Sequence, residues 1–145
     1  MVRSSDSPIV ILGSRTLAPV IQVFALYVIA HGHYSPGGGF QGGALLAASI
    51  ILVRLSVGRR LGDLQFRRVM GTPMGVVGTL AFAAIGLVAM MGSGYFLQYT
   101  ALPMGGIDPA MQRNLGILLV EFAVGLAVTG SVVAIYDDLT EPLHE

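Results

Sequence analysis

The chain has 145 residues, of which 54% are hydrophobic and 11% are charged, with no cysteine and a formal net charge of zero. Soluble domains carry roughly 25% charged residues, so this composition excludes an ordinary soluble domain and indicates an integral membrane protein. The balanced charge gives no reason to expect a nucleic-acid partner, and without cysteine there is no disulfide, thiolate metal site or cysteine-held iron–sulfur cluster.

The first apolar run covers residues 9–30, which is long enough to cross a bilayer core of roughly 30 Å. Three residues interrupt it, namely Arg15, Pro19 and Gln22. Because Pro19 leaves the carbonyl group of Arg15 without its helical partner, we expect a kink or a partly interfacial first turn. The Arg15 guanidinium should then reach toward the lipid headgroups.

Residues 31–43 read His-Gly-His-Tyr-Ser-Pro-Gly-Gly-Gly-Phe-Gln-Gly-Gly. Proline removes a backbone donor and glycine is a poor helix former, so this stretch predicts a reversal of the chain between the first two helices. No Lys-Ser or Lys-Thr follows the glycines, so the run does not indicate a nucleotide-binding loop. We interpret it as a glycine-rich hinge on the outer side of the membrane, formed by Pro36, Gly37, Gly38, Gly39, Gly42 and Gly43.

Three further apolar runs follow, over about residues 40–57, 74–97 and 114–136. Small residues recur along them at the spacing that lets membrane helices approach closely. In the second run these are Gly43 with Ala47 and Ala44 with Ala48, and in the third Gly75, Thr79, Ala83 and Gly86. Tyr95 and Tyr99 suit an interfacial belt, and the turn residues of 98–113 predict a loop.

The polar segment of residues 58–73 sets the predicted orientation. It contains four arginines, and Arg54 lies just before it, whereas the connections after the first and third helices contain none and Arg113 alone. Basic residues in short loops favour the cytoplasmic side, so we expect this segment and both termini to lie in the cytoplasm. The hinge and the loop of residues 98–113 then lie outside.

One acid, Glu121, falls inside the fourth run. An ionisable group within a membrane helix is costly and faces protein or a wet cavity, and the next turns of its helix face carry Gly125 and Thr129, which are small enough to pack on protein. Two interpretations stay open: a protonatable relay group or half of an ion pair on a cation path, and an acid whose hydrogen bonds fix the register of the helix.

His31 and His33 are the other titratable candidates. Two residues apart, they would point in nearly opposite directions on one helix, which is poor geometry for a shared metal ion, so no metal site is predicted. Each could take up or release protons near neutral pH, or could brace the hinge by hydrogen bonding.

The string from His31 to Gly43 closely resembles the signature of the MnhB family, the B subunits of multi-subunit Mrp-type sodium/proton antiporters, with related subunits in membrane-bound hydrogenase and similar respiratory complexes. The segment from Val120 to Gly130 resembles the last helix of that family, which often shows an aspartate and, two residues on, a glycine. Here Glu121 stands at the acidic position and Ala123 replaces the glycine. The resemblance covers essentially the whole chain.

The resemblance implies an all-α polytopic membrane protein with four transmembrane helices, in which residues 1–145 form a single MnhB-like integral membrane domain. It implies a transporter subunit of the cell membrane rather than an enzyme, an accessory part of a cation (sodium)/proton antiporter with no cofactor. Its partners would be other membrane subunits, sodium ions, protons and the lipid bilayer. Glu121, His31 and His33 are the residues that could help line the ion or proton pathway.

Two other hypotheses compete with this one. The chain could be a purely structural membrane subunit of a hydrogenase-like respiratory complex that carries an Mrp-type module. It could also be a stand-alone small membrane protein, such as a homo-oligomeric channel, which would be stable when purified without partners.

Overall fold

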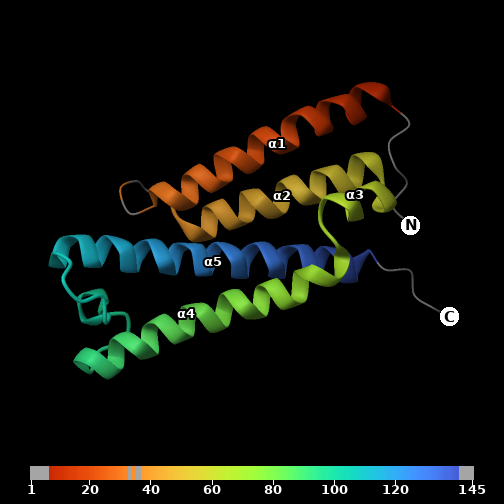
Figure 1. Cartoon of the computed structure of the whole chain (residues 1–145). Coiled ribbons are helices and arrows are strands. Elements are labelled where there is room, and N and C mark those ends of the chain that lie inside the picture. The colour runs from red at the N-terminus through yellow and green to blue at the C-terminus, as the bar shows by residue number, and fades with distance from the viewer. Residues whose placement is uncertain (1–6, 33, 35–36, 141–145) are drawn as a thin grey trace.

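Four long helices make up the architecture (Figure 1): α1 (Pro8–His31), α2 (Gly39–Val57), α4 (Gly71–Ser93) and α5 (Pro109–Leu139). Each is long and apolar enough to cross a membrane, so the predicted all-α membrane fold with four spanning helices is confirmed. Shorter elements are α3 (Arg59–Gln65) and two 3₁₀ turns, η1 (Arg68–Met70) and η2 (Tyr99–Ala101). The computed structural model describes residues 7–32, 34 and 37–140, and within these ranges there is no strand.

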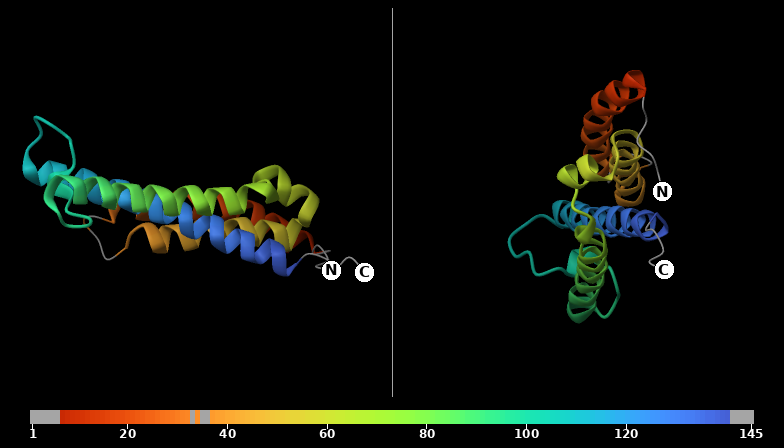
Figure 2. Two further views of the ribbon diagram at one scale, coloured as in Figure 1. Left: turned by 90° about the horizontal axis from the view of Figure 1, so that it is seen from below. Right: turned by 90° about the vertical axis from the view of Figure 1, so that its right-hand side faces the viewer.

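The helices stand side by side in one curved row, in the order α1, α2, α5, α4 (Figures 1 and 2). α2 and α5 therefore form the middle of the row, and α1 and α4 form its two edges. Because the number of spans is even, the start of α1 and the end of α5 lie at the same end of the bundle, which also holds α3 (Figure 1). A small core of Ala47, Ile50 and Val133 lies between α2 and α5 near that end, with Phe66 packed against it.

Glycines bring α4 and α5 into backbone contact. A Cβ atom added at Gly78 would overlap the backbone of Ala127, and one at Gly130 would lie 2.6 Å from the carbonyl oxygen of Gly71. In a membrane, where apolar burial between helices gains little, such close backbone approach is a main source of helix association.

The predicted small-residue stripe of the third helix is only partly correct. Gly75 lies in the contact with α5, but Thr79 is exposed and Gly86 packs beneath the ring of Phe96. Steps of four residues drift around a helix with 3.6 residues per turn, so the contact follows Gly71, Gly75 and Gly78 instead.

On α2 the first of the two predicted small pairs lies in a helix contact. Gly43 and Ala47 are buried, whereas Ala48, of the second pair, is exposed. Of the residues interpreted as the hinge, Gly39, Gly42 and Gly43 belong to the first turns of α2 rather than to the connection. Their poor helix propensity is offset by the close packing against α1 and α5 that only glycine permits.

The ends of two spans differ from the prediction. α4 begins at Gly71 and stops at Ser93, because Gly94 takes up the left-handed conformation with φ of 82° that suits glycine. α5 begins at Pro109, inside the predicted loop, because Asp108 caps it: its carboxylate accepts a 3.0 Å hydrogen bond from the backbone N–H of Ala110. Proline is favoured in the first turn of a helix, so Pro109 starts α5 rather than marking a turn.

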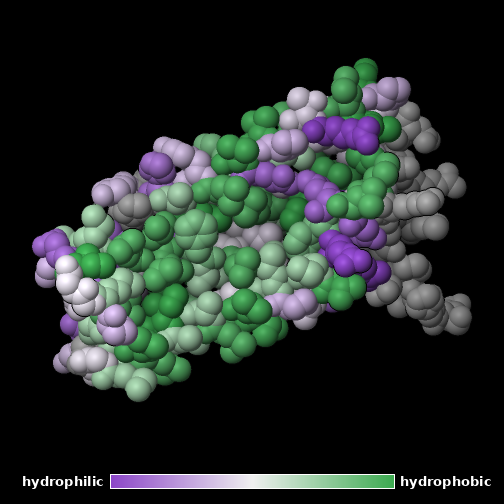
Figure 3. All heavy atoms as spheres, viewed as in Figure 1, coloured by the Kyte–Doolittle hydropathy of each residue, from purple (hydrophilic) through white to green (hydrophobic). Residues whose placement is uncertain are grey.

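Apolar side chains dominate the visible face of the row, and the most polar residues gather at the end where α3 lies (Figure 3). α1 runs as one helix through Pro19, and Arg15 is exposed on it. Large apolar side chains such as Val23, 69% exposed, and Met91, 87% exposed, lie open on α1 and α4. An exposed apolar surface of this extent fits contact with lipid or with other membrane helices.

Candidate functional site

Glu121 points from α5 into the connection between α1 and α2, where it is partly buried. A Cβ atom added at Gly32, which ends α1, would overlap both carboxylate oxygens, and one at Gly38 would lie 3.3 Å from Oε1. A Cβ atom at Gly39 would overlap the backbone carbonyl of Glu121 itself. These three glycines, called the glycine cradle below, leave just enough room for the acid.

Two helix ends converge on this carboxylate. α1 ends at His31 and α2 begins at Gly39, so the last carbonyls of one helix and the first N–H groups of the other lie at the same place. Such groups lack partners within their own helix, and they carry partial negative and partial positive charge respectively. The cradle can therefore offer both donors and acceptors to a carboxyl group or to a small ion beside it.

A cavity of about 370 Å³ opens next to the acid. Its described lining consists of residues 37–39, Phe40, Gln41 and Glu121, so Glu121 is the titratable side chain of that lining. An acid beside a small polar cavity can hold a proton and exchange it with water, and it can attract a small cation.

Contacts further along the helices fix the position of Glu121. A Cβ atom at Gly43 would lie 2.7 Å from the carbonyl oxygen of Gly125, so α2 and α5 touch through their backbones. The Thr129 hydroxyl is buried and lies 3.1 Å from the carbonyl oxygen of Gly43 and 2.7 Å from that of Gly125, as a donor that its neighbours share. The prediction that the Gly125 and Thr129 face packs on protein is confirmed.

Tyr99, in the turn η2 between α4 and α5, approaches the same acid from another side. Its side chain packs on Gly116, where an added Cβ atom would lie 2.7 Å from the Tyr99 Cβ atom. Burial raises the pKa of the Tyr99 phenol, and the negative charge of Glu121 raises it further. The prediction of an interfacial belt therefore suits Tyr95, which is 73% exposed, better than Tyr99.

His31 lies exposed at the end of α1, and its ring stacks on Tyr27 with 4.2 Å between the ring centroids. His33 and Pro36 lie outside the described residues, as does His144. Within the described part of the chain, no three histidine, aspartate or glutamate side chains gather in a way that could hold a metal ion.

A second polar contact, which the sequence reasoning missed, joins α2 to α5 at the opposite end. The Arg54 guanidinium is buried, with 2% of its side chain exposed, and it forms an ion pair with Asp137, which is also buried. It also donates a 2.8 Å hydrogen bond to the carbonyl of Phe66, and Asp63 lies 3.8 Å away.

The packing around Arg54 depends on a glycine. A Cβ atom at Gly62 of α3 would lie 2.6 Å from the Arg54 Cγ atom. Arg68 adds a 3.1 Å hydrogen bond to the backbone carbonyl of Asp137. The sequence signal was present in an arginine inside an apolar run and an acid at the end of another, but the two lie 83 residues apart.

Residues 9–134 match a domain family described as related to the MnhB subunit of Na⁺/H⁺ antiporters. Two similar proteins carry names that make each the B subunit of a Na⁺/H⁺ antiporter. The one from Alkalihalophilus pseudofirmus is 28% identical over 136 residues, covering 87% of this chain and 90% of that protein. The one from Bacillus subtilis is 30% identical over 125 residues, covering 80% of this chain and 84% of that protein.

Two longer proteins are also similar. An uncharacterised protein of Methanocaldococcus jannaschii is 32% identical over 139 residues, and the chain spans about half of it, 53%. A chain in the structure of the membrane-bound sulfane sulfur reductase, an archaeal respiratory membrane complex, shares the fold with a TM-score of 0.69 at 24% identity, covering 96% of this chain and 60% of that chain.

Proposed function

The chain belongs to the family of domains related to the MnhB subunit of Na⁺/H⁺ antiporters, and on this basis we propose that it is an accessory membrane subunit of a multi-subunit sodium/proton antiporter. The match over residues 9–134 carries the proposal, because it includes both Glu121 and the glycine cradle. With one acid in the interior of its apolar helices, the chain has too few polar groups to run a transport cycle by itself. It therefore works with other membrane subunits, which carry most of the proton path.

Within that complex we assign Glu121 to the ion or proton pathway. Three features of the acid support this role: it lies inside a spanning helix, it borders a cavity of about 370 Å³, and two helix ends converge on it. An ionisable side chain is rarely retained in a membrane helix unless it serves a pathway or a fixed polar contact. His31, exposed beside Tyr27, is a secondary candidate on the same side.

The orientation of the chain follows from its arginines. The end of the bundle that holds α3 carries the arginines of residues 59–68, so it should lie in the cytoplasm, together with both termini. The cradle and Glu121 then lie toward the outer side.

The first test is a pull-down of the tagged chain from its native membrane in mild detergent, with mass spectrometry of the proteins that come with it. Large antiporter-like subunits and other small hydrophobic subunits are the expected result. Hydrogenase or other redox subunits in the same particle would favour a structural subunit of a respiratory complex. Recovery of the chain alone would overturn the proposal in favour of a stand-alone membrane protein.

The second test separates a pathway role for Glu121 from a packing role. Glu121→Gln keeps the size of the side chain but removes its proton and charge, whereas Glu121→Asp keeps the acid. We expect Glu121→Gln to reduce sodium/proton exchange in membrane vesicles at least tenfold and Glu121→Asp to keep part of it, with equal yields of assembled complex. Exchange at the native rate in a normally assembled Glu121→Gln complex would leave Glu121 with a packing role only.

A further inference from the structure

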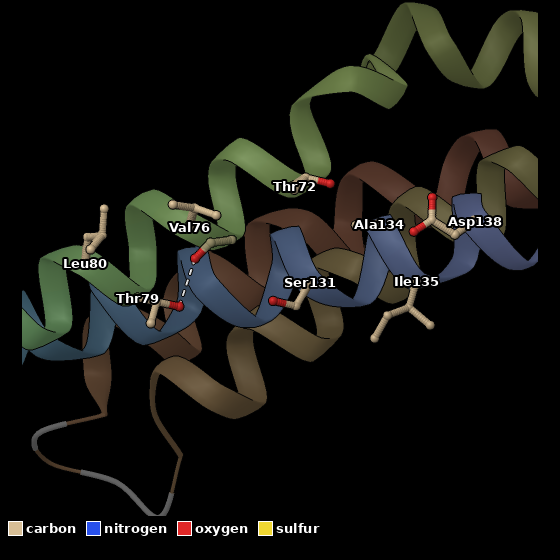
Figure 4. Close-up of a pocket in the computed structure, with 9 residues that line it drawn as sticks. Thr72, Val76, Thr79, Leu80, Ser131, Ala134, Ile135 and Asp138 are labelled. Carbon is tan, nitrogen blue, oxygen red and sulfur yellow. Dashed lines mark hydrogen bonds between the residues drawn. The ribbon is translucent and has the colours of Figure 1, made fainter.

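A groove runs between α4 and α5 on one side of the helix row (Figure 4). Its volume is about 410 Å³, and Thr72 and Val76 of α4 line it together with Ser131 and Asp138 of α5. Gly75 lies at its base, where an added Cβ atom would lie 3.1 Å from the Ser131 hydroxyl oxygen. The groove is thus hollowed by the same glycine that lets the two helices approach.

The groove exposes polar groups on what is otherwise an apolar surface. Thr72, Ser131 and Asp138 are all exposed, and the part of the chain that the structure describes offers none of their side chains a hydrogen bond or ion pair. Thr79 behaves differently, because its hydroxyl is already bonded to the carbonyl of Gly75 at 2.9 Å (Figure 4). Three groups in one groove therefore have hydrogen-bonding capacity to spare.

Lipid chains are poor occupants of such a groove. A hydroxyl group in hydrocarbon without a partner is costly, and hydroxyl side chains in membrane proteins pair across helix interfaces. Small residues at the base of a groove also let a second helix approach closely. Both features, the spare hydroxyl of Ser131 and the base at Gly75, fit a neighbouring helix better than an acyl chain.

Charge narrows the choice of neighbour further. Asp138 lies at the arginine-rich end of the bundle, but Arg54 is engaged by Asp137, and Arg68 donates to the backbone carbonyl of Asp137. The Asp138 carboxylate is thus left to meet a positive charge from outside the described chain. Membrane helices commonly carry Lys or Arg at their cytoplasmic ends, which is the side predicted for this end of the bundle.

We propose that the α4–α5 groove is the docking site for a transmembrane helix of another subunit, one that places a hydrogen-bonding side chain opposite Ser131 and a lysine or arginine opposite Asp138. This inference rests on the proposed function in so far as it requires a multi-subunit complex. The M. jannaschii relative, of which this chain matches 53%, has further polypeptide attached to the matching region, as a partner helix would supply.

The chain has no cysteine, so single-cysteine variants can probe the groove directly. Val76→Cys lies in the groove, and Val77→Cys is its matched control: both are valines on α4, 51% and 56% exposed, but Val77 does not line the groove. A thiol-reactive photo-crosslinker attached in the intact complex, followed by mass spectrometry, would identify what lies against each position. Ser131→Cys probes the facing helix.

We expect Val76→Cys and Ser131→Cys to crosslink to the same transmembrane helix of another subunit, at several times the yield from Val77→Cys. The crosslinked helix should have a lysine or arginine within reach of Asp138. Crosslinks to lipid alone, or equal protein yields from Val76→Cys and Val77→Cys, would overturn the docking site.

A charge exchange provides a second readout that does not depend on crosslinking. Asp138→Arg should lower the yield of assembled complex several-fold, and an acidic residue at the mapped basic position of the partner should restore it. A partner that co-purifies but never crosslinks to the groove would contradict this inference and leave the proposed function intact. Absence of any co-purifying protein would contradict both.

Discussion

Replacing Arg54 by methionine should strongly destabilise the protein. The Arg54 side chain is 2% exposed and that of Asp137 is 8% exposed, so the variant would leave a buried carboxylate without its ion-pair partner. Breaking one side of a buried pair costs about 3–5 kcal/mol. Each ~1.4 kcal/mol is a tenfold change in an equilibrium constant, so a loss of about 4 kcal/mol lowers the ratio of folded to unfolded protein roughly a thousandfold.

The double variant Arg54→Met with Asp137→Leu should recover most of that loss. Replacing both members of a buried pair by apolar residues is often close to neutral, because no uncompensated charge stays behind. The hydrogen bond from Arg54 to the Phe66 carbonyl is still lost, so a deficit of about 1 kcal/mol should persist.

The assay is the amount of assembled complex in the membrane, together with its thermal denaturation midpoint in mild detergent. Arg67→Met is the matched control, because Arg67 is an exposed arginine of the neighbouring segment, and exposed charges contribute little to stability. The reasoning would be refuted if Arg54→Met behaved like Arg67→Met, or if the double variant were no more stable than the single one.

Three further predictions follow from particular residues. Gly32→Ala puts a methyl group onto the carboxylate in the cradle and should lower sodium/proton exchange in vesicles several-fold, whereas Gly13→Ala, where an added Cβ meets nothing within 4 Å, should not; equal exchange in the two would contradict the cradle. With a membrane-impermeant maleimide, Leu64→Cys should label only from the cytoplasmic side and Ile107→Cys only from the outside, and labelling from one common side would contradict the orientation. Because burial and the nearby carboxylate raise the pKa of Tyr99, the folded state disfavours the tyrosinate, so stability should fall as pH rises above about 10. In thermal scans, Tyr99→Phe should lose less stability over that range, and an unchanged loss would exclude this tyrosine as its cause.

The number of spans, and the place of Glu121 on a protein-facing side of its helix, could be predicted from the sequence. Both depend on local patterns: long apolar runs identify spans, and small residues at steps of four reveal one helix face. Gly125 and Thr129 were interpreted correctly for that reason. Helix ends were less accurate, because Pro109 and Gly94 act through capping geometry that depends on single residues such as Asp108.

The groups that come to Glu121 from other helices could not be predicted from a single sequence. Gly32 and Gly38 were interpreted as parts of a hinge, which describes the chain locally but not what it surrounds. Tyr99 was assigned to an interfacial belt because tyrosines near the end of a span usually lie there, and nothing in its neighbours indicates that it turns toward α5. The partner of Arg54 was missed since pairing between distant segments leaves no local pattern.

The two polar contacts between α2 and α5 lie at opposite ends of the same helix pair. At one end the first turn of α2 meets Glu121, at the other Arg54 meets Asp137, and between them Gly43 lies in backbone contact with α5. A helix fastened in this way cannot slide by one turn, about 5.4 Å, without breaking both polar contacts. The register of Glu121 against the start of α2 is therefore set by packing over the whole length of the pair. This is why a change at Arg54, remote from the acid, should also disturb the geometry of the cradle.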